Sequence, residues 1–312
     1  MKWDERIGRR LRLKDLHTLQ TVAEVGSMAR AAERLALSQP AISKAVSDME
    51  RVLGAPLLDR SSRGVELTEC GRLLVERTRV IFDEISQGAL DIDRMSDPTI
   101  GNVKIGTTEP VAGVVSEIIS RLRSQYPRLT YDVTISDLDT LIDELRQRTR
   151  DVVMTRWAPP PTADDLAVRT LFKSSLAVMA AHGHPLLRRK KLDLANLMTE
   201  RWTLSPPDSF LGRVVLDLFR RRKLPLPPTV VTTISIHMRL HLLAGGDFLT
   251  VLPAQMLRYP SNRAWLRALD IDLRDSSQPI ASITLKRRRA NGAAKLFEHG
   301  ALQVCKMMAE AQ

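Results

Sequence analysis

Three short helical patterns occupy residues 13–54, and they constrain the fold more than any other feature of the chain. Apolar residues recur at 3.6-residue spacing up to Gly26, where we expect the first helix to end. Ser27 and Ser38 are natural N-caps for a second and a third helix. Pro40 falls in the first turn of the third, where its missing N–H costs nothing. A helix, a short turn and a helix with a polar outer face form the helix-turn-helix plan.

A β-hairpin, or wing, is predicted over residues 57–67, directly after the third helix. Two short apolar strands flank the turn Ser61-Ser-Arg-Gly64. Arg60 and Arg63 lie at the tip of this wing, from where they could reach phosphates or a minor groove.

These blocks together resemble the winged helix of the LysR-type transcriptional regulators. They stand in the family's order and spacing and are Ser27-Met-Ala-Arg-Ala-Ala-Glu-Arg-Leu35, Ser38-Gln-Pro-Ala-Ile-Ser43, Leu53-Gly54, Leu57-Leu58-Asp59-Arg60 and Leu67-Thr-Glu-Cys-Gly71. Leu58 departs from the family's usual phenylalanine, but it is apolar and can fill a core position. The resemblance implies a DNA-binding winged helix-turn-helix domain over residues 1–67.

The start of the third helix supplies the candidate groups for reading DNA. In the major groove Gln39 can pair bidentately with adenine and Lys44 can reach guanine acceptors, unless both simply lie on a solvated face. Ser38, Ser43 and Arg30 suit phosphate oxygens, although Ser38 could also be a plain N-cap. The candidate DNA-binding set, which includes one proline that only shapes the backbone, is Arg30, Ser38, Gln39, Pro40, Ser43, Lys44, Arg60 and Arg63.

A long dimerisation helix is predicted over residues 68–97, with Thr68 as its cap. Apolar residues alternate there by four and three positions, which is a heptad seam. The expected dimer contacts are Leu74, Ile81, Ile85 and Ile92. The alternative is a monomeric helix packed on its own domain. A dimer would place two recognition helices on an inverted-repeat site.

From residue 98 onward, short apolar strands alternate with helices, which predicts an α/β fold with a parallel sheet. This part resembles the effector domain of the same family, which has two Rossmann-like lobes related to periplasmic binding proteins. The expected lobes are residues 100–167 with 274–312, and residues 168–273, joined by crossovers near 168–171 and 269–273.

A ligand in such a fold binds at the carboxyl ends of strands, between the lobes. The candidate effector-binding residues follow predicted strands and are Thr107, Thr108, Ser136, Thr155, Arg156, Ser205 and Ser235. Each could equally be a helix cap or a turn residue, and the fork of Arg156 suits a carboxylate. Glu109 argues against a strongly anionic group beside it, and a sugar hydroxyl or an amine would fit better, so the charge of the effector stays open.

The net charge of +11 suggests a polyanionic partner. Part of the excess lies in three later runs, which could also be solvated surface: Arg188–Lys191, Arg220–Lys223 and Lys286–Arg289. The sequence has no membrane-spanning stretch and no secretory signal, so we expect a cytoplasmic protein with reduced Cys70 and Cys305.

We expect no enzyme activity, no metal and no cofactor. His237 and His241 lie four apart but lack the intervening Glu and the third ligand of a zinc site, and neither a phosphate loop nor a nucleophile elbow occurs.

The expected function is a LysR-type regulator whose binding to promoter inverted repeats is modulated by a small-molecule effector. Its expected partners are double-stranded DNA, the effector, further copies in a homodimer or homotetramer, and RNA polymerase. An architectural DNA-binding protein that ignores ligands and a small-molecule-binding enzyme are the alternatives.

Overall fold

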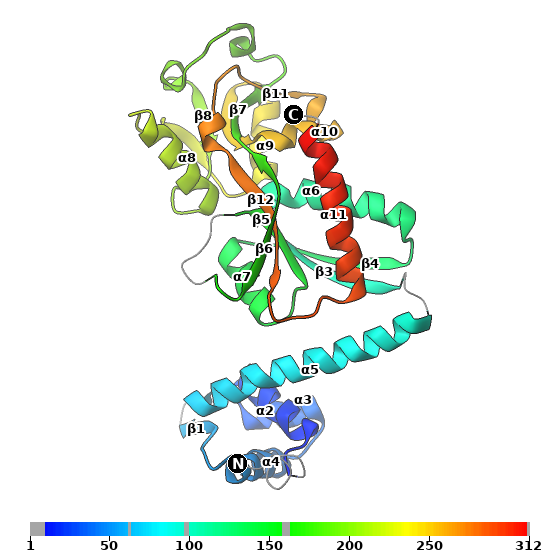
Figure 1. Ribbon diagram of the computed structural model, residues 1–312. Coiled ribbons are helices and arrows are strands. Elements are labelled where there is room, and N and C mark those ends of the chain that lie inside the picture. The colour runs from blue at the N-terminus through cyan, green and yellow to red at the C-terminus, as the bar shows by residue number, and fades with distance from the viewer. Residues whose placement is uncertain (1–9, 62–63, 97–99, 158–162, 311–312) are drawn as a thin grey trace. The chain divides into compact units, whose positions relative to one another are not determined.

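The computed structural model describes residues 10–61, 64–96, 100–157 and 163–310 of the chain (Figure 1). Its internal contacts form two compact units, residues 1–90 and residues 91–312. The boundary falls inside the long helix predicted over residues 68–97. No helix of the described chain is long and apolar enough to cross a membrane.

The first unit is the expected winged helix. Its elements are α2 (Leu13–Val25), α3 (Met28–Leu35), α4 (Gln39–Leu53), β1 (Leu58–Ser61) and β2 (Gly64–Leu67), followed by α5 (Glu69–Ser96). The hydroxyl of Ser27 accepts from the N–H of Arg30 at 3.4 Å, and that of Ser38 from the N–H of Ala41 at 3.3 Å, so both predicted caps are confirmed. Gly26 ends α2 with a φ of 64°, in the left-handed region that glycine tolerates best.

The helices of this unit enclose one apolar core. Leu19, Val22, Ala31, Ile42 and Val46 are all fully buried in it. The core also explains the glycine where α5 leaves the wing, because a Cβ at position 71 would collide with a backbone carbonyl oxygen of the chain entering β1.

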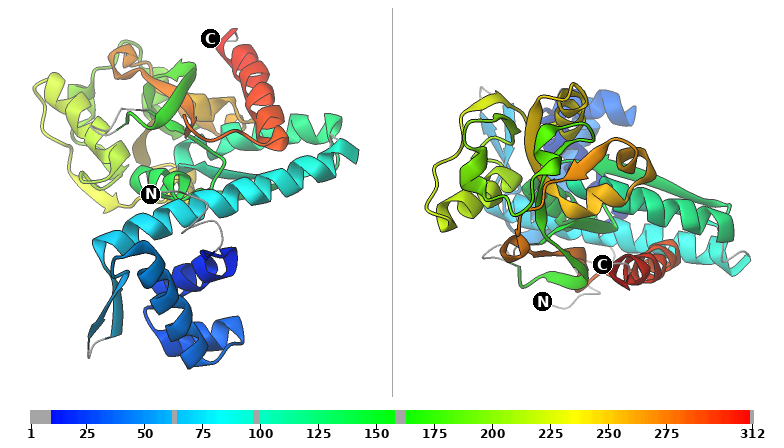
Figure 2. Two further views of the ribbon diagram at one scale, coloured as in Figure 1. Left: turned by 60° about the horizontal axis from the view of Figure 1, so that its bottom comes forward. Right: turned by 90° about the horizontal axis from the view of Figure 1, so that it is seen from above.

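The second unit contains two five-stranded sheets, the first of which has the order β4-β3-β5-β12-β6. Its strands are β3 (Gly101–Thr107), β4 (Leu129–Ile135), β5 (Val152–Arg156), β6 (Leu166–Ser174) and β12 (Gln278–Leu285). The predicted parallel pairing holds for β4, β3 and β5, whereas β12 runs antiparallel to both of its neighbours. Helices α6 (Glu109–Gln125) and α11 (Gly292–Glu310) pack together on one face (Figures 1 and 2), and α7 (Leu138–Arg146) packs on the other.

The predicted boundary between the lobes was wrong by several residues. We expected the chain to cross near 168–171, but β6 pairs with β12 along its whole length and so belongs to the first sheet. The chain crosses instead at Ser175 and returns through η4 (Arg274–Ser276). The partner strand lies more than a hundred residues further along the chain, and no local pattern in the sequence reveals such a pairing.

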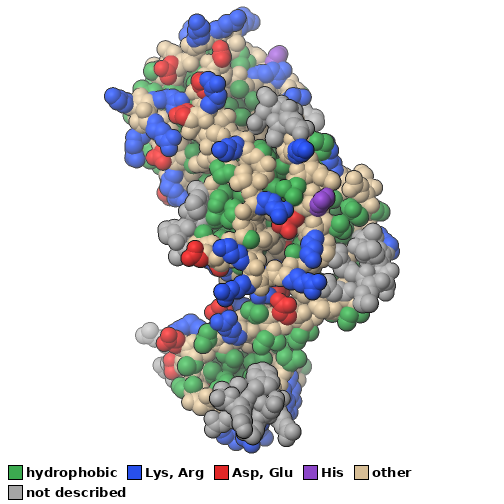
Figure 3. All heavy atoms as spheres, in the orientation of Figure 1, with side chains coloured by type: hydrophobic (Ala, Val, Ile, Leu, Met, Phe, Trp, Pro, Cys, Tyr) green, Lys and Arg blue, Asp and Glu red, His purple; other side chains and the backbone are tan. Residues whose placement is uncertain are grey.

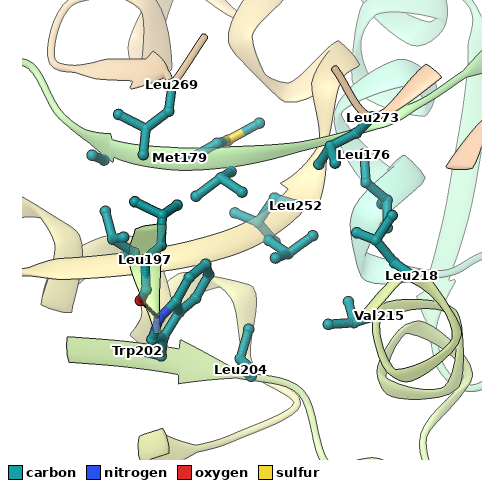
Figure 4. Close-up of a cluster of buried hydrophobic side chains, with 14 of the residues drawn as sticks. Leu176, Met179, Leu197, Trp202, Leu204, Val215, Leu218, Leu252, Leu269 and Leu273 are labelled. Atoms are coloured by element: carbon teal, nitrogen blue, oxygen red, sulfur yellow. Dashed lines mark hydrogen bonds between the residues drawn. The ribbon is translucent and has the colours of Figure 1, made fainter. Parts of the chain in front are cut away.

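The second sheet has the order β11-β7-β10-β8-β9. Its strands are β7 (Leu176–Ala181), β8 (Arg201–Leu204), β9 (Thr229–Thr232), β10 (Phe248–Pro253) and β11 (Leu266–Ala268), the last of which the sequence did not predict. Helices α8 (Phe210–Arg221) and α9 (Ile236–Ala244) pack on it, and the shorter helices are η1 (Pro185–Arg188), η2 (Leu194–Leu197), η3 (Ala254–Arg258) and α10 (Pro260–Arg263). Trp202 lies at the centre of its core (Figure 4), where the indole N–H donates to the carbonyl of Leu197 at 2.8 Å.

Candidate DNA-binding and effector-binding sites

The start of α4 presents polar side chains to solvent above a buried residue. Ser38, Gln39 and Lys44 are exposed, while Ile42 is fully buried beneath them. The hydroxyl of Ser38 is used as the helix cap, but a serine oxygen can accept from the helix and still donate outward. Pro40 is also exposed, in the first turn of the helix as expected.

The remaining candidates of this unit differ in what the structure shows of them. Arg30 is exposed on α3, and Ser43 is half-buried on α4. The backbone of Arg60 pairs with Val65 in the wing, but its side chain lies outside the described part of the chain, as does the whole of Arg63. Ser47, which the sequence places on the outer side of the same helix but outside the candidate set, is exposed four residues after Ser43.

The predicted heptad seam of α5 is buried at its N-terminal end and exposed further along the helix. Leu74 packs against the core of the winged helix, and Thr78 is fully buried there, so this end of the seam lies against its own domain. Ile81, Ile85 and Ile92 are 38%, 49% and 68% exposed. Among the predicted dimer contacts, the exposed ones therefore begin at Ile81, seven residues later than predicted.

Four of the candidate effector residues meet at the carboxyl ends of β3, β4 and β5. Thr107 is fully buried, and its hydroxyl donates to the carbonyl of Met154 at 2.9 Å. Thr108 is half-buried, with its hydroxyl 3.2 Å from that of Thr155. The N–H of Ser136 donates to the carbonyl of Thr107 at 3.2 Å. Thr107 therefore acts within the sheet, and Thr108 is the more accessible of the two adjacent threonines.

The other two serines follow the neighbouring strands β8 and β9 of the second sheet. Ser205 is nearly buried. Ser235 caps α9 by accepting from the N–H of Met238 at 3.2 Å. The N–H of Thr233 donates to the carbonyl of Leu204 at 3.0 Å, which joins the ends of the two strands.

Glu109, the first residue of α6, forms hydrogen bonds between the strand ends of the first lobe and those of the second. Its carboxylate accepts from the N–H of Ile236 at 2.9 and 3.0 Å and from the N–H of His237 at 3.2 Å. Thr108, which follows β3, is thus next to a carboxylate that accepts a hydrogen bond from the residue after Ser235 in the second lobe. The sequence singled out Glu109 for its charge, but it carried no signal for this contact across 127 residues.

Arg156 does not present an open fork to a ligand, contrary to the expectation. Its side chain is 1% exposed, and its guanidinium donates to the carbonyls of Ser174 at 3.1 Å and Ser276 at 3.4 Å. Burial lowers the pKa of Arg156 to about 10, so it remains charged at neutral pH. It ties together the two chain crossings between the lobes, which explains why a strand-end arginine is buried here.

Parts of the basic runs are engaged in ion pairs. Arg222 contacts Asp275 at 2.9 Å, Arg220 contacts Asp217 at 3.5 Å, and the nearly buried Arg288 contacts Asp151 at 3.0 Å. On the face shown in Figure 3, Lys and Arg side chains are spread out with Asp and Glu among them. These runs contribute to the net charge without forming one of the candidate sites.

The histidines and cysteines form no described group of three or more metal-ligating residues. The Nε2 atoms of His237 and His241 lie 3.0 Å apart on α9. Cys70 is exposed, and Cys305 is buried on α11, where burial raises its pKa to about 12.

Two family models match the chain. The model "Bacterial regulatory helix-turn-helix protein, lysR family" matches residues 13–72, and "LysR substrate binding domain" matches residues 96–305. The HTH-type transcriptional regulator GbpR of Azospirillum brasilense is 29% identical, over 92% of this chain and 84% of that relative. The HTH-type transcriptional activator CmpR of Synechocystis sp. is 24% identical, over 83% and 84%.

Solved structures with this fold include full-length CbnR complexed with its target DNA. It has a TM-score of 0.63 and 21% identity, over 94% of this chain and all of that one. A variant of full-length OxyR from Pseudomonas aeruginosa has a TM-score of 0.66 and 19% identity, over 95% of each chain. At these identities the likeness concerns the fold alone.

Proposed function

Because the chain belongs to the LysR family, and so is a DNA-binding transcriptional regulator with a substrate-binding domain, we propose that it acts as a dimer on an inverted repeat. In this proposal α4 and the wing read a promoter site, and an effector bound between the two lobes modulates that binding. The exposed polar start of α4, held above a buried isoleucine, is the observation that carries the proposal.

Base reading falls to Gln39 and Lys44. Both are exposed near the N-terminus of α4, where a recognition helix approaches base edges. An amide can bond adenine at two positions at once, and an ammonium can reach the acceptors of guanine. Ser38, Ser43 and Arg30, with the wing residues Arg60 and Arg63, serve the phosphate backbone and so set affinity more than specificity.

Pairing of two copies uses the exposed part of α5. Ile81, Ile85 and Ile92 form an apolar stripe that a second copy would remove from water. Two winged helices then meet two half-sites of an inverted repeat. The proposed location is the cytoplasm. The proposed partners are double-stranded DNA, an effector, further copies in a homodimer or homotetramer, and RNA polymerase, and the proposal requires no cofactor.

Effector binding is assigned to the facing strand ends of the two lobes. Thr108, Thr155 and Ser136 lie on one side, and Ser205 and Ser235 lie on the other. An effector changes DNA binding only if it binds one arrangement of the lobes better than another.

The proposal is tested by measuring the DNA affinity of the full-length protein and of its Gln39→Ala variant. With promoter DNA and a scrambled duplex over a salt series, we expect Gln39→Ala to cost about 1–3 kcal/mol on the specific site only. Arg30→Ala should weaken both DNAs alike and reduce the salt dependence. Gln20→Ala is the matched control, because Gln20 bonds Glu24 on α2 and lies outside the candidate set. Equal losses on both DNAs for Gln39→Ala would remove it from the base-reading role.

A further inference from the structure

The carboxylate of Glu109 completes the N-terminus of a helix in the opposite lobe. Ile236 and His237, whose N–H groups it accepts, are the first two residues of α9, and Ser235 accepts from the third. The first N–H groups of a helix lack partners within the helix and favour negative charge. The end of α9 that faces the first lobe is therefore already filled by a carboxylate of the same chain.

A second positive group lies on the same helix. Arg239 is fully buried, and its Nε and Nη2 atoms find no hydrogen-bond partner among the described residues. Only Nη1 is bonded, to Thr250 and the carbonyl of Val251, both at 3.4 Å. Burial lowers the pKa of Arg239 to about 10 and the charge of Glu109 raises it, so this arginine is cationic at neutral pH. The carboxylate that caps α9 therefore also acts electrostatically on the buried guanidinium of the same helix.

The position of Glu109 is fixed by neighbouring contacts between the same two lobes. The side-chain amide of Gln255 donates to the carbonyl of Pro110 at 3.3 Å. The ring of Tyr259 packs where a Cβ of residue 113 would otherwise lie, and Tyr259 also contacts the apolar cores of both lobes. The second lobe therefore holds the first turns of α6 at several points. These contacts fix the backbone of Glu109, so the position of its carboxylate at α9 does not depend on the Glu109 side chain alone.

The strand-end residues offer little to a second anion. Arg156 is buried, and both of its Nη atoms donate to carbonyls at the chain crossings, while its Nε atom has no partner among the described residues. The remaining candidates, Thr108, Thr155, Ser136, Ser205 and Ser235, carry neutral hydroxyls. A neutral hydroxyl both donates and accepts hydrogen bonds, so these residues suit an uncharged polar ligand.

We propose that Glu109 is a built-in occupant of the positive end of α9, and that it restricts the effector to molecules presenting hydroxyl, amide or amine groups there. An effector carboxylate or phosphate would compete with a carboxylate that is already in place. This inference rests on the proposed function for its effector, but the occupancy of α9 by Glu109 can be tested without one.

The first experiment measures the thermal stability of the full-length protein in sodium acetate against sodium chloride of equal ionic strength. Wild type should show no difference between the salts. Glu109→Ala, which empties the end of α9, should gain an acetate-specific rise in Tm of about 2–4 °C at acetate concentrations several times the Kd. Glu117→Ala is the matched control, because it removes an exposed carboxylate from the same helix, where it pairs with Arg121.

Two results would overturn the inference: an equal acetate response in wild type, or no acetate response in a folded Glu109→Ala protein. Glu109→Gln keeps the shape of the side chain and removes its charge. If the alanine variant fails to fold, the glutamine variant must show a smaller acetate response of the same sign, and its absence would also reject the inference.

The second experiment compares neutral aldohexoses and aldopentoses with the corresponding aldonic acids as modulators of DNA binding. In wild type, only the neutral member of a pair should act, and Glu109→Ala should shift the response toward the acid. An acid acting on wild type more strongly than its neutral partner would contradict the assigned class. If no compound of any charge class alters DNA binding, the effector response itself fails, while the acetate experiment still decides on Glu109.

Discussion

The two units of this protein hold their candidate functional groups in opposite ways. In the winged helix, Gln39 and Lys44 project into solvent from a helix whose other face is buried. In the two-lobed unit, the polar groups at the strand ends bond one another, and a carboxylate of one lobe caps a helix of the other. The first surface is preformed for a large rigid partner, whereas a ligand of the second unit must exchange hydrogen bonds that the protein already makes.

The largest expected effect comes from placing charge on the exposed stripe of α5. Ile85→Asp should weaken self-association by about ten- to hundredfold, because each buried isoleucine contributes about 1.5–3 kcal/mol. Its free energy of unfolding as a monomer should hardly change, since the side chain is 49% exposed. Sedimentation equilibrium measures the first quantity and denaturant unfolding the second. Ser86→Asp is the matched control, because Ser86 is the exposed neighbour outside the stripe. Equal association of both variants would place the dimer contact elsewhere.

A smaller effect compares two serine caps, one in each unit. Ser38→Ala and Ser235→Ala each remove an oxygen that accepts from a backbone N–H near the start of a helix. Each should cost about 1 kcal/mol of stability in its own unit. Only Ser38→Ala should also lower DNA affinity, because its hydroxyl is exposed at the start of α4. Calorimetry together with a DNA titration checks both expectations, and a loss of DNA affinity in Ser235→Ala would show that the units are coupled.

The smallest effect is a pH dependence confined to the second unit. Hydrogen bonds from the N–H and hydroxyl of Thr140 lower the pKa of Asp137, the cap of α7. A lowered folded pKa means that the stabilisation is present above the unfolded value of about 4 and is lost as the pH falls through the folded value. The side chain is exposed, so the change should be about 0.5 kcal/mol or less. Acid unfolding of Asp137→Asn should lack this component, and identical acid profiles for both proteins would contradict it.

Local signals were strongest in the winged helix. Serine caps, a first-turn proline and ending glycines act over three or four residues, so Ser27, Ser38 and Gly26 could be read directly from the chain. The same reasoning found most strands and helices of the second unit to within a few residues. It failed for β6 and β11, because strand membership depends on a partner that can lie anywhere in the chain.

The sequence by itself determined the helix-turn-helix plan, the exposed polar start of α4 and the alternation of strands and helices that follows, because these depend on local periodicity and caps. Tertiary structure decided which of the predicted dimer contacts on α5 stay exposed, since Leu74 packs against the winged-helix core. It also decided that Arg156 is buried and that Glu109 caps α9. Both outcomes depend on residues brought together from more than a hundred positions apart, where charge and burial act through space rather than along the chain.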